Sequence, residues 1–331
     1  MEHKAFHSEQ STIPYRRIGA GFCGSVWSQP DHDKIDSAST AIKREDGGPG
    51  RSLHNDFTMH KIILQAYEEC PDQIRDCFLI PKCYDFIPAT YSGWDATNVI
   101  KRFPENYLPC NTLITQRIPP IPKNGRDVLI NKYCSPPLAD NISADVKNSD
   151  CLVRPYLGRR KFGQRESKVH FFSLRNYPLH IDQMSDLDLD PPQYATGMAK
   201  ALAFMHWSAG VDANDVEFVL APAPRPATPR FHSQQLGSHN LWILDFDCCR
   251  RMRMDQDGVM QAAQAFLRND PFYPRPGREN TEDKELWNHF RNTFLEVSSF
   301  ILQTGNKPYE ELPLLLMDTI ESLVQKRTDN P

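Results

Sequence analysis

Glycine residues at short spacing precede a lysine in the N-terminal part of the chain. Gly19, Gly21 and Gly24 lie within the segment 18–26, Ile-Gly-Ala-Gly-Phe-Cys-Gly-Ser-Val, and Lys43 ends the segment Ala-Ile-Lys. Glycines let a backbone turn lie close over phosphate groups, and a lysine on a neighbouring strand can reach the same anion. The spacing therefore predicts a site for a phosphate-bearing ligand. A glycine-rich hairpin that binds nothing is the alternative interpretation.

Acidic residues flank two apolar stretches in the second half of the chain, 216–220 and 241–244. They are Asp212, Asp215, Glu217, Asp245 and Asp247. Carboxylates at the ends of apolar strands can hold Mg²⁺ or a cationic group. We therefore expect Asp212, Glu217 and Asp245 to face one cleft beneath the glycine-rich segment. Exposed loop acids without a ligand are the alternative.

The glycines, the lysine and two of the acids resemble, in this order, the motifs of protein kinases and aminoglycoside phosphotransferases. The resemblance implies that Lys43 binds phosphate, that Asp212 replaces the catalytic-loop aspartate and that Asp245 replaces the metal-binding aspartate. It also implies a two-lobed fold and, for a phosphotransferase, Mg-ATP. The chain departs from these families at Glu217, where they carry a metal-binding Asn, and at Val211, where they carry His or Arg.

Four further segments resemble a fungal family that has long been labelled as zinc-finger proteins. They are 171–176 (FFSLRN), 205–207 (MHW), 215–220 (DVEFVL) and 268–276 (RNDPFYPRP). That family resembles the fungal arginine-containing cyclodipeptide synthases. These enzymes take arginine from arginyl-tRNA and a second residue from another aminoacyl-tRNA, and they release cyclo-arginine-Xaa dipeptides for secondary metabolism. The resemblance implies an aminoacyltransferase whose partners are charged tRNAs.

The acidic group fits this second resemblance as well as it fits a magnesium site. A guanidinium group is planar and always charged, and paired carboxylates hold it best. The candidate catalytic residues are Asp212, Glu217 and Asp245. The candidate substrate-binding residues are Asp215, Asp247, Lys43, Gly19, Gly21 and Gly24. Together they predict an arginine pocket beneath the glycine-rich segment.

Aminoacyl transfer needs further groups that the sequence offers more than once. Attack of an amine on the ester of a charged tRNA requires a base and donors for the oxyanion. The base is either a carboxylate of the acidic group or His206, for which a buried structural histidine is the alternative. Ser173 and Cys249 are both possible covalent nucleophiles.

Two basic clusters are candidates for contact with the acceptor stem of the tRNA. The first comprises Arg154, Arg159, Arg160, Lys161, Arg165 and Lys168, and the second comprises Arg250, Arg251 and Arg253. A solvated face is the alternative interpretation of each.

The expected order of strands and helices predicts an α+β chain with a protein-kinase-like bilobal fold. A small antiparallel β lobe over 1–117 carries the glycine-rich segment. Its expected elements are strands within 15–43, a helix over 53–68 and strands at 79–81 and 111–118. The helix offers Asp56 and Glu68 as alternative partners for Lys43.

A proline-rich segment over 118–122 predicts the passage to a mainly helical lobe over 118–331. Apolar residues three and four apart predict helices around 198–205 and 286–301. A second proline-rich stretch predicts an exposed loop insertion over 221–239.

Composition restricts the cell compartment and the partners. The net charge of -4 shows no basic excess, so DNA is not an expected partner and any contact with RNA is local. The nine cysteines are odd in number and lack a Cys-x-x-Cys pair, so neither a disulfide framework nor a structural metal is predicted. No apolar run approaches the ~20 residues of a membrane span, and the N-terminus lacks the apolar core of a signal peptide. We expect a cytoplasmic protein without a membrane partner.

Overall fold

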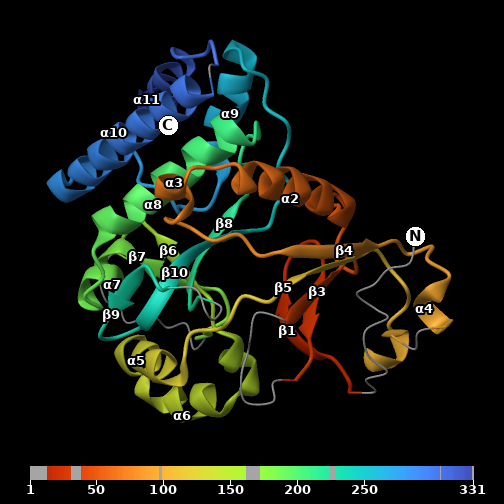
Figure 1. Ribbon diagram of the computed structural model, residues 1–331. Coiled ribbons are helices and arrows are strands. Elements are labelled where there is room, and N and C mark those ends of the chain that lie inside the picture. The colour runs from red at the N-terminus through yellow and green to blue at the C-terminus, as the bar shows by residue number, and fades with distance from the viewer. Residues whose placement is uncertain are drawn as a thin grey trace.

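The computed structural model describes residues 13–30, 39–96, 99–161, 172–223, 228–305 and 307–329. It contains two five-stranded sheets with helices around them, an α+β arrangement (Figure 1). The first sheet is formed by the N-terminal part of the chain. The second lies between α5 and α6 at one end and α9, α10 and α11 at the other.

The first sheet has the strand order β1-β2-β3-β5-β4, with every neighbouring pair antiparallel. Its strands are β1 (Arg16–Ala20), β2 (Ser25–Ser28), β3 (Thr40–Arg44), β4 (Cys83–Ile87) and β5 (Thr112–Gln116). The strand predicted at 79–81 is displaced, because β4 begins only at Cys83. Leu79 instead pairs in parallel with Trp242 of the second sheet.

Helix α2 (Leu53–Glu68) confirms the predicted helix and lies beside the first sheet. The Ser52 hydroxyl accepts a hydrogen bond from the Asn55 amide and caps the first turn. One face of the helix is buried and includes Asp56 and His60. This face carries polar side chains into the interior between the two sheets.

The outer face of the first sheet is covered by an aromatic cluster. Short helices α3 (Asp72–Arg75), α4 (Gly93–Ala96) and η1 (Val99–Arg102) connect its strands. Trp27 contacts Phe103 and Tyr107 edge to face, with ring centroids 5.5 and 5.1 Å apart. The fully buried Arg44 guanidinium lies 4.3 Å from the Phe103 ring centroid, where it gains a cation–π interaction. This packing fixes β3, the strand that carries Lys43.

The chain passes from the first sheet to the second through residues 117–122. The segment continues into α5 (Lys123–Tyr133), α6 (Pro136–Ala144) and η2 (Val146–Asp150). The Ile121 amide donates to the Cys151 carbonyl at 2.8 Å, so the segment is held against the start of the second sheet.

The second sheet has the order β7-β6-β8-β10-β9, in which only β6 and β7 are parallel. Its strands are β6 (Val153–Tyr156), β7 (Tyr177–His180), β8 (Glu217–Ala221), β9 (Phe231–Ser233) and β10 (Gly237–Leu244). The prediction of a mainly helical region was therefore incomplete. The apolar runs before and after the proline-rich stretch pair with each other as β8 and β10, and this pairing satisfies their backbone groups.

The predicted loop insertion over 221–239 is wrong in its extent. Ala221 ends β8, and both β9 and the start of β10 fall within the predicted range. Phe231 and Leu236 are buried in the main core, which explains why the chain returns to the sheet so soon. Residues 224–227 of the proline-rich stretch lie outside the described residues.

Helices cover the second sheet and form the main core with it. They are α7 (Ile181–Asp186), α8 (Pro191–Ala203), the π-helical turn η3 (Phe204–Ser208), α9 (Gln256–Arg268), α10 (Thr281–Thr304) and α11 (Leu312–Asp329). The helices predicted around 198–205 and 286–301 correspond to α8 with η3 and to α10. The Trp207 indole donates to Ser298 Oγ at 2.8 Å and joins η3 to α10.

The two sheets are joined directly as well as through the connecting segment. The Leu79 amide donates to the Leu241 carbonyl at 2.8 Å, and the Ile243 amide donates to the Leu79 carbonyl at 2.9 Å. Leu79 thus extends the second sheet beside β10 although it belongs to the chain segment before β4. This contact holds the end of β10 at a defined position relative to α2 and β3.

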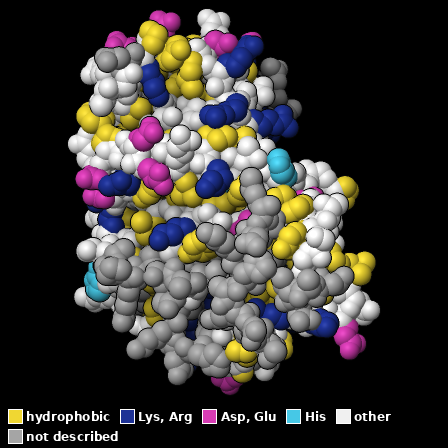
Figure 2. Space-filling view, turned by 45° about the vertical axis from the view of Figure 1, so that its right-hand side comes forward, with side chains coloured by type: hydrophobic (Ala, Val, Ile, Leu, Met, Phe, Trp, Pro, Cys, Tyr) yellow, Lys and Arg dark blue, Asp and Glu magenta, His cyan; other side chains and the backbone are white. Residues whose placement is uncertain are grey.

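Figure 2 shows one face of the molecule, on which Lys and Arg side chains are scattered among acidic and apolar side chains. The described Lys and Arg side chains on this face do not form one continuous patch. Within the described residues, no helix combines the length and the apolar character needed to cross a bilayer.

Candidate functional site

A cavity of about 260 Å³ lies between the two sheets beneath the segment 18–26, here called the glycine-rich segment. Ile18 and Val26 line it from the first sheet, and Leu152 and Leu244 line it from the second. Charged side chains of both signs complete the lining. The acids are Asp56, Asp150, Glu217 and Asp245, and the bases are Lys43, Arg117, Arg154 and Arg175.

The three predicted glycines of this segment all line the cavity, but they differ in what the backbone requires of them. A Cβ atom on Gly24 would lie 2.0 Å from the Arg44 carbonyl oxygen, and its φ of +148° is a conformation that favours glycine. A Cβ atom on Gly21 would meet no atom within 4 Å. The turn is held from outside by Asp46, which accepts hydrogen bonds from the Ser25 amide and hydroxyl.

Lys43 connects the three elements that surround the cavity. Its ammonium nitrogen lies 2.8 Å from Asp56 Oδ2 on α2 and 2.6 Å from Asp245 Oδ1 after β10. Burial acts to lower the pKa of Lys43, but Asp245 and Asp56 outweigh it and raise the pKa well above its usual value. Lys43 is therefore a permanent cation, and Asp56 rather than Glu68 is its partner on the helix.

Asp245 combines an exposed carboxylate with a strained backbone. It directly follows β10, and its φ of +68° lies in the left-handed region, which is uncommon for a residue with a side chain. Its side chain is 31% exposed, and Lys43 is its one ion-pair partner among the described residues. Strained residues at the edge of a cavity often serve function. Asp245 is thus the acid best placed to receive a cation from a ligand.

Glu217 begins β8 and lines the same cavity, but it already has a cationic partner. Arg154 Nη2 lies 2.6 Å from Glu217 Oε1 and 2.5 Å from Oε2. Burial raises the pKa of Glu217 to about 7; Arg154 opposes this shift and the negative charge of Asp245 adds to it. The shift moves the pKa of this carboxyl group toward neutral pH, the range in which a general base works best.

Asp212 does not belong to the cavity lining, contrary to the expectation that it faces one cleft with Glu217 and Asp245. Its side chain is buried, and Oδ1 accepts hydrogen bonds from the amides of Asn214 and Arg250 at 3.1 and 2.9 Å. Oδ2 accepts a third from Gln261 Nε2 at 2.8 Å. Because a buried carboxylate needs such donors, these bonds hold Asp212 in the loop structure.

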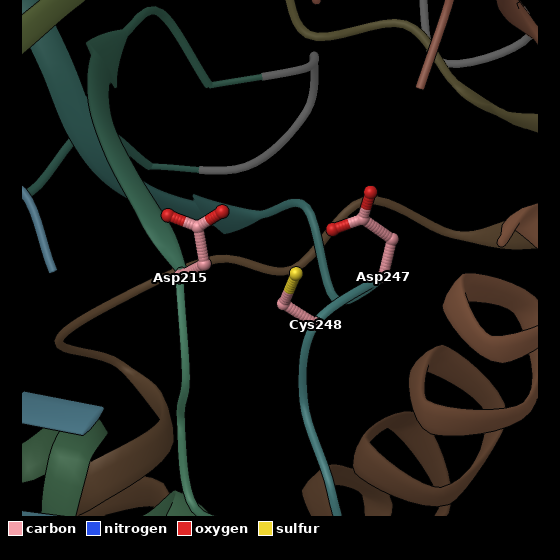
Figure 3. A group of neighbouring side chains, drawn as sticks. All are labelled: Asp215, Asp247 and Cys248. Atoms are coloured by element: carbon pink, nitrogen blue, oxygen red, sulfur yellow. The ribbon is translucent and has the colours of Figure 1, made fainter. Parts of the chain in front are cut away.

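Asp215 and Asp247 lie beside Cys248 in a separate cluster (Figure 3). Arg51 contacts all three side chains, and the four residues are here called the Arg51 cluster. Arg51 Nη2 lies 2.6 Å from Asp215 Oδ2, and Nη1 lies 2.8 Å from Asp247 Oδ1 and 2.6 Å from Cys248 Sγ. The two predicted substrate-binding acids therefore share a single guanidinium of the chain, which offsets one of their two negative charges.

The structure also places the candidate base His206 and the candidate nucleophiles Cys249 and Ser173. Burial lowers the pKa of His206 to about 4, and its Nδ1 lies 2.9 Å from the Val211 carbonyl oxygen, so it is a buried neutral histidine. Burial raises the pKa of Cys249 well above its usual value, which disfavours the nucleophilic thiolate. The Ser173 hydroxyl accepts a hydrogen bond from the Arg175 amide. The surroundings of His206 and Cys249 therefore disfavour the roles predicted for them.

The residue patterns predict Lys43 in the cavity, but they do not indicate that Arg154 faces it or that Arg51 pairs with Asp215 and Asp247. Arg154 was predicted only as part of a basic cluster, although it directly precedes Pro155 in a strand beside β8. Arg51 follows Gly50 in a loop and carries no periodic signal. Both depend on contacts between distant segments, which a residue pattern does not specify.

A protein-family model described as zinc finger protein matches residues 241–306, from β10 to the end of α10. No curated protein matches the chain. Among the described residues, the one group of three or more potential ligands is the Arg51 cluster, which offers a single sulfur atom. A structural zinc site needs four ligands, usually Cys and His. The matched segment covers well under half of the chain and leaves the family of the whole chain open.

Proposed function

We propose that this chain is an aminoacyltransferase with a protein-kinase-like arrangement of its two sheets. It takes arginine from arginyl-tRNA and joins it to the amino acid of a second aminoacyl-tRNA, releasing cyclo-arginine-Xaa dipeptides for fungal secondary metabolism. Charged tRNA is a cytoplasmic substrate, so the proposal implies a cytoplasmic enzyme. The observation that carries it is the partly exposed Asp245 carboxylate in a cavity that already holds a permanent cation, Lys43.

The likeness to protein kinases lies in the order of the elements along the chain and in the ion pairs of Lys43. A glycine-rich turn joins β1 to β2, Lys43 of β3 pairs with Asp56 of α2, and Asp245 follows the last long strand of the second sheet. Protein kinases join the corresponding lysine to an acid on a helix in the same way. The likeness supports a cavity that holds a nucleoside.

A nucleoside is also what a charged tRNA offers. The 3′ end of tRNA is an adenosine whose ribose carries the aminoacyl ester, so a cavity suited to ATP is chemically suited to this adenosine. The apolar side chains of Ile18, Val26, Leu152 and Leu244 provide surfaces on which a base can lie. In the proposed complex, the ester then lies near Lys43 and Asp245.

Asp245 binds the arginyl side chain in this proposal. Its Oδ1 accepts from Lys43, and the side chain retains exposed surface on the cavity side. A charge-assisted hydrogen bond from guanidinium contributes about 1.5–3 kcal/mol. Glu217 no longer serves this purpose, because a substrate guanidinium would have to displace Arg154.

Glu217 is the base of the proposed reaction. It takes a proton from the amine of the second aminoacyl group, whose nitrogen forms a bond to the arginyl carbonyl carbon. The bond from that carbon to the ribose oxygen breaks, and the proton passes to the departing oxygen. A second exchange of the same kind, by the arginyl amine on the remaining ester, closes the ring. Lys43 has a third N–H beyond those given to Asp56 and Asp245, and it donates to the oxyanion.

The test is a product assay with the full chain. The protein is incubated with arginyl-tRNA and a mixture of other aminoacyl-tRNAs, and products are read by mass spectrometry. We expect cyclic dipeptides that contain arginine and depend on both charged tRNAs. Release of free arginine alone would contradict the transfer step.

An ATP-dependent phosphotransferase is the second candidate, and the Lys43–Asp56 pair favours it. Asp245 would hold Mg²⁺, which shields the phosphates of ATP. The predicted acids offer few further ligands for Mg²⁺ beside Asp245. Glu217 is paired with Arg154, and Asp212 is hydrogen-bonded on both oxygens. ATP turnover that requires Mg²⁺, without arginine transfer, would favour this candidate. Binding of ATP without turnover would instead indicate a pseudokinase-like interaction module.

A further inference from the structure

A second pocket, of about 600 Å³, opens where β6 ends, and it is here called the basic pocket. Its lining contains five cationic side chains, one histidine and no acidic residue. The charged or titratable residues are Arg159, Arg160, Lys161, His180, Arg275 and Arg278. A concave surface lined by charges of one sign concentrates counter-ions. The composition of the lining therefore points to an anionic ligand.

The basic pocket is held together by the backbone, so its shape does not depend on a ligand. The Leu157 and Gly158 amides donate to the carbonyls of Phe272 and Pro271 at 3.0 and 2.9 Å, which joins the end of β6 to the segment after α9. A Cβ atom on Gly158 would lie 2.4 Å from the Tyr273 carbonyl oxygen, so only glycine permits this approach. Arg278 donates to the Gly158 carbonyl at 2.9 Å.

The positive charge of the basic pocket is only partly neutralised. Arg160 pairs with Glu282 and Asp283 of α10. The side chains of Arg159 and Lys161 make no ion pair with a described residue and are exposed. Burial lowers the pKa of Arg275 to about 10, and the neighbouring cations Arg278 and Arg327 add to the shift. Cations therefore outnumber the acids that pair with them among the described residues of this pocket.

The basic pocket and the cavity are lined by neighbouring parts of one chain segment, β6 and the turn that follows it. Arg154 of β6 lines the cavity, and Gly158, four residues later, lines the basic pocket. Because β6 ends at Tyr156 and residues 157–158 form a turn, Arg154 and Gly158 lie closer together than the roughly 13 Å of four fully extended residues. A nucleic-acid strand carries a phosphate about every 3.4 Å along a stacked helix. At most about four stacked nucleotides therefore cover the separation between these two residues.

We propose that the basic pocket binds the phosphate groups of a single-stranded RNA 3′ end whose terminal nucleoside occupies the cavity. This inference rests on the proposed function for the identity of the strand. Phosphate itself is the shared chemistry, because the same cations would also hold a small polyphosphate. The side chains of Arg159 and Lys161 supply the charges that meet the ligand, and Arg278 shapes the pocket.

The first experiment measures RNA binding by the full-length protein. Fluorescence anisotropy with a labelled RNA ending in ACCA is recorded over a range of KCl concentrations. The double variant Arg159→Ala/Lys161→Ala removes two exposed charges, and Arg250→Ala/Arg253→Ala removes two from the other basic cluster as a matched control. We expect the first to weaken binding about tenfold or more and to reduce the salt slope by about 1–1.5, from roughly 0.7 per phosphate contact. Equal losses in both double variants would overturn the assignment.

The second experiment reads the site without activity or RNA. Burial lowers the pKa of His180, and the positive charges of Arg159 and Lys161 lower it further. Pyrophosphate bound beside these cations should raise that pKa, which an NMR titration of the imidazole measures. The rise should disappear in the Arg159→Ala/Lys161→Ala variant. An unchanged His180 titration with both pyrophosphate and RNA would overturn the phosphate site.

The outcomes separate the basic pocket from the proposed function. RNA binding that depends on Arg159 and Lys161, without any arginine dipeptide in the product assay, retains the pocket and removes the proposed reaction. Pyrophosphate binding at His180 without RNA binding overturns the RNA assignment and leaves a small polyphosphate as the ligand. Arginine dipeptide formation that is equal in both double variants retains the reaction and removes the pocket from it.

Discussion

The cavity beneath the glycine-rich segment and the Arg51 cluster each contain an aspartate that follows β10, but the two aspartates have opposite environments. The Asp245 side chain is 31% exposed and has one ion-pair partner, whereas the Asp247 side chain is 2% exposed and bound to Arg51. They lie two residues apart in the sequence. The difference arises from the loop before α2, which supplies Arg51 to one and not to the other. An acid is available to a ligand only where the fold leaves it underneutralised.

The largest expected effects come from removing the cation of each region. Lys43→Met leaves Asp56, and Arg51→Met leaves Asp247, as a buried carboxylate with its main partner lost. Breaking such a pair costs about 3–5 kcal/mol of unfolding free energy. Urea denaturation should show this loss in both variants, with partial recovery in Lys43→Met/Asp56→Asn and Arg51→Met/Asp247→Asn. Losses below about 1 kcal/mol would mean that these pairs are solvated.

The base assigned to the cavity gives the next largest effect. Glu217→Gln retains the shape of the side chain but cannot accept the proton, so kcat/KM for arginyl-tRNA should fall about 100-fold or more. Only the ionised carboxylate is a base, and its pKa is raised to about 7. The wild-type rate should therefore rise with pH up to about 7 and then level off. If the rate of Glu217→Gln still rose with pH in the same way, the titrating group would be a residue other than Glu217.

The same pKa shift has a consequence for stability. Because the folded-state pKa of Glu217 lies above its unfolded value of 4.5, the folded protein binds this proton more tightly. The resulting contribution to stability is fully present below about pH 4.5 and is lost as pH rises through about 7. Glu217→Gln should remove this part of the pH dependence in urea denaturation.

The smallest effect distinguishes the glycines above the cavity. Gly24→Ala should destabilise the protein by about 1–3 kcal/mol, because its backbone conformation and the nearby Arg44 carbonyl exclude a Cβ atom. Gly21→Ala has room for a methyl group and should change stability by less than about 0.5 kcal/mol. Thermal denaturation of the two variants checks this. Equal losses would show that Gly21 also needs its conformational freedom.

Much of the first region follows from local sequence signals. The helix Leu53–Glu68 has a serine cap and an uninterrupted apolar face, and the glycines mark the turn between β1 and β2. The second sheet was harder to predict from the sequence, because β6 and β7 are short and pair in parallel across an intervening segment. Such pairing depends on distant contacts that a short apolar run does not specify.

The sequence predicts most residues of the candidate site, but it does not predict which of the acids line the cavity and which are bound by other side chains. The sequence places Glu217, Asp245 and Lys43 at the ends or centres of apolar strands, and all three line the cavity. The same signal applies to Asp212, which is hydrogen-bonded to Gln261, and to Asp247, which is paired with Arg51. Those partners come from helix α9 and a loop, so only the three-dimensional arrangement separates available acids from neutralised ones.

The rates of Asp245→Asn and Asp247→Asn show whether Asp245 is the acid that binds arginine. Both changes remove one charge, and mass spectrometry measures the rate of cyclo-arginine dipeptide formation from charged tRNAs. Loss of the guanidinium contact should lower kcat/KM about 10- to 100-fold in Asp245→Asn, from about 1.5–3 kcal/mol per charge-assisted hydrogen bond. Asp247→Asn, if folded, should remain within about threefold of the wild type, since less than 1 kcal/mol corresponds to that change. Equal rates in the two variants would contradict the assignment of Asp245 as the arginine-binding acid.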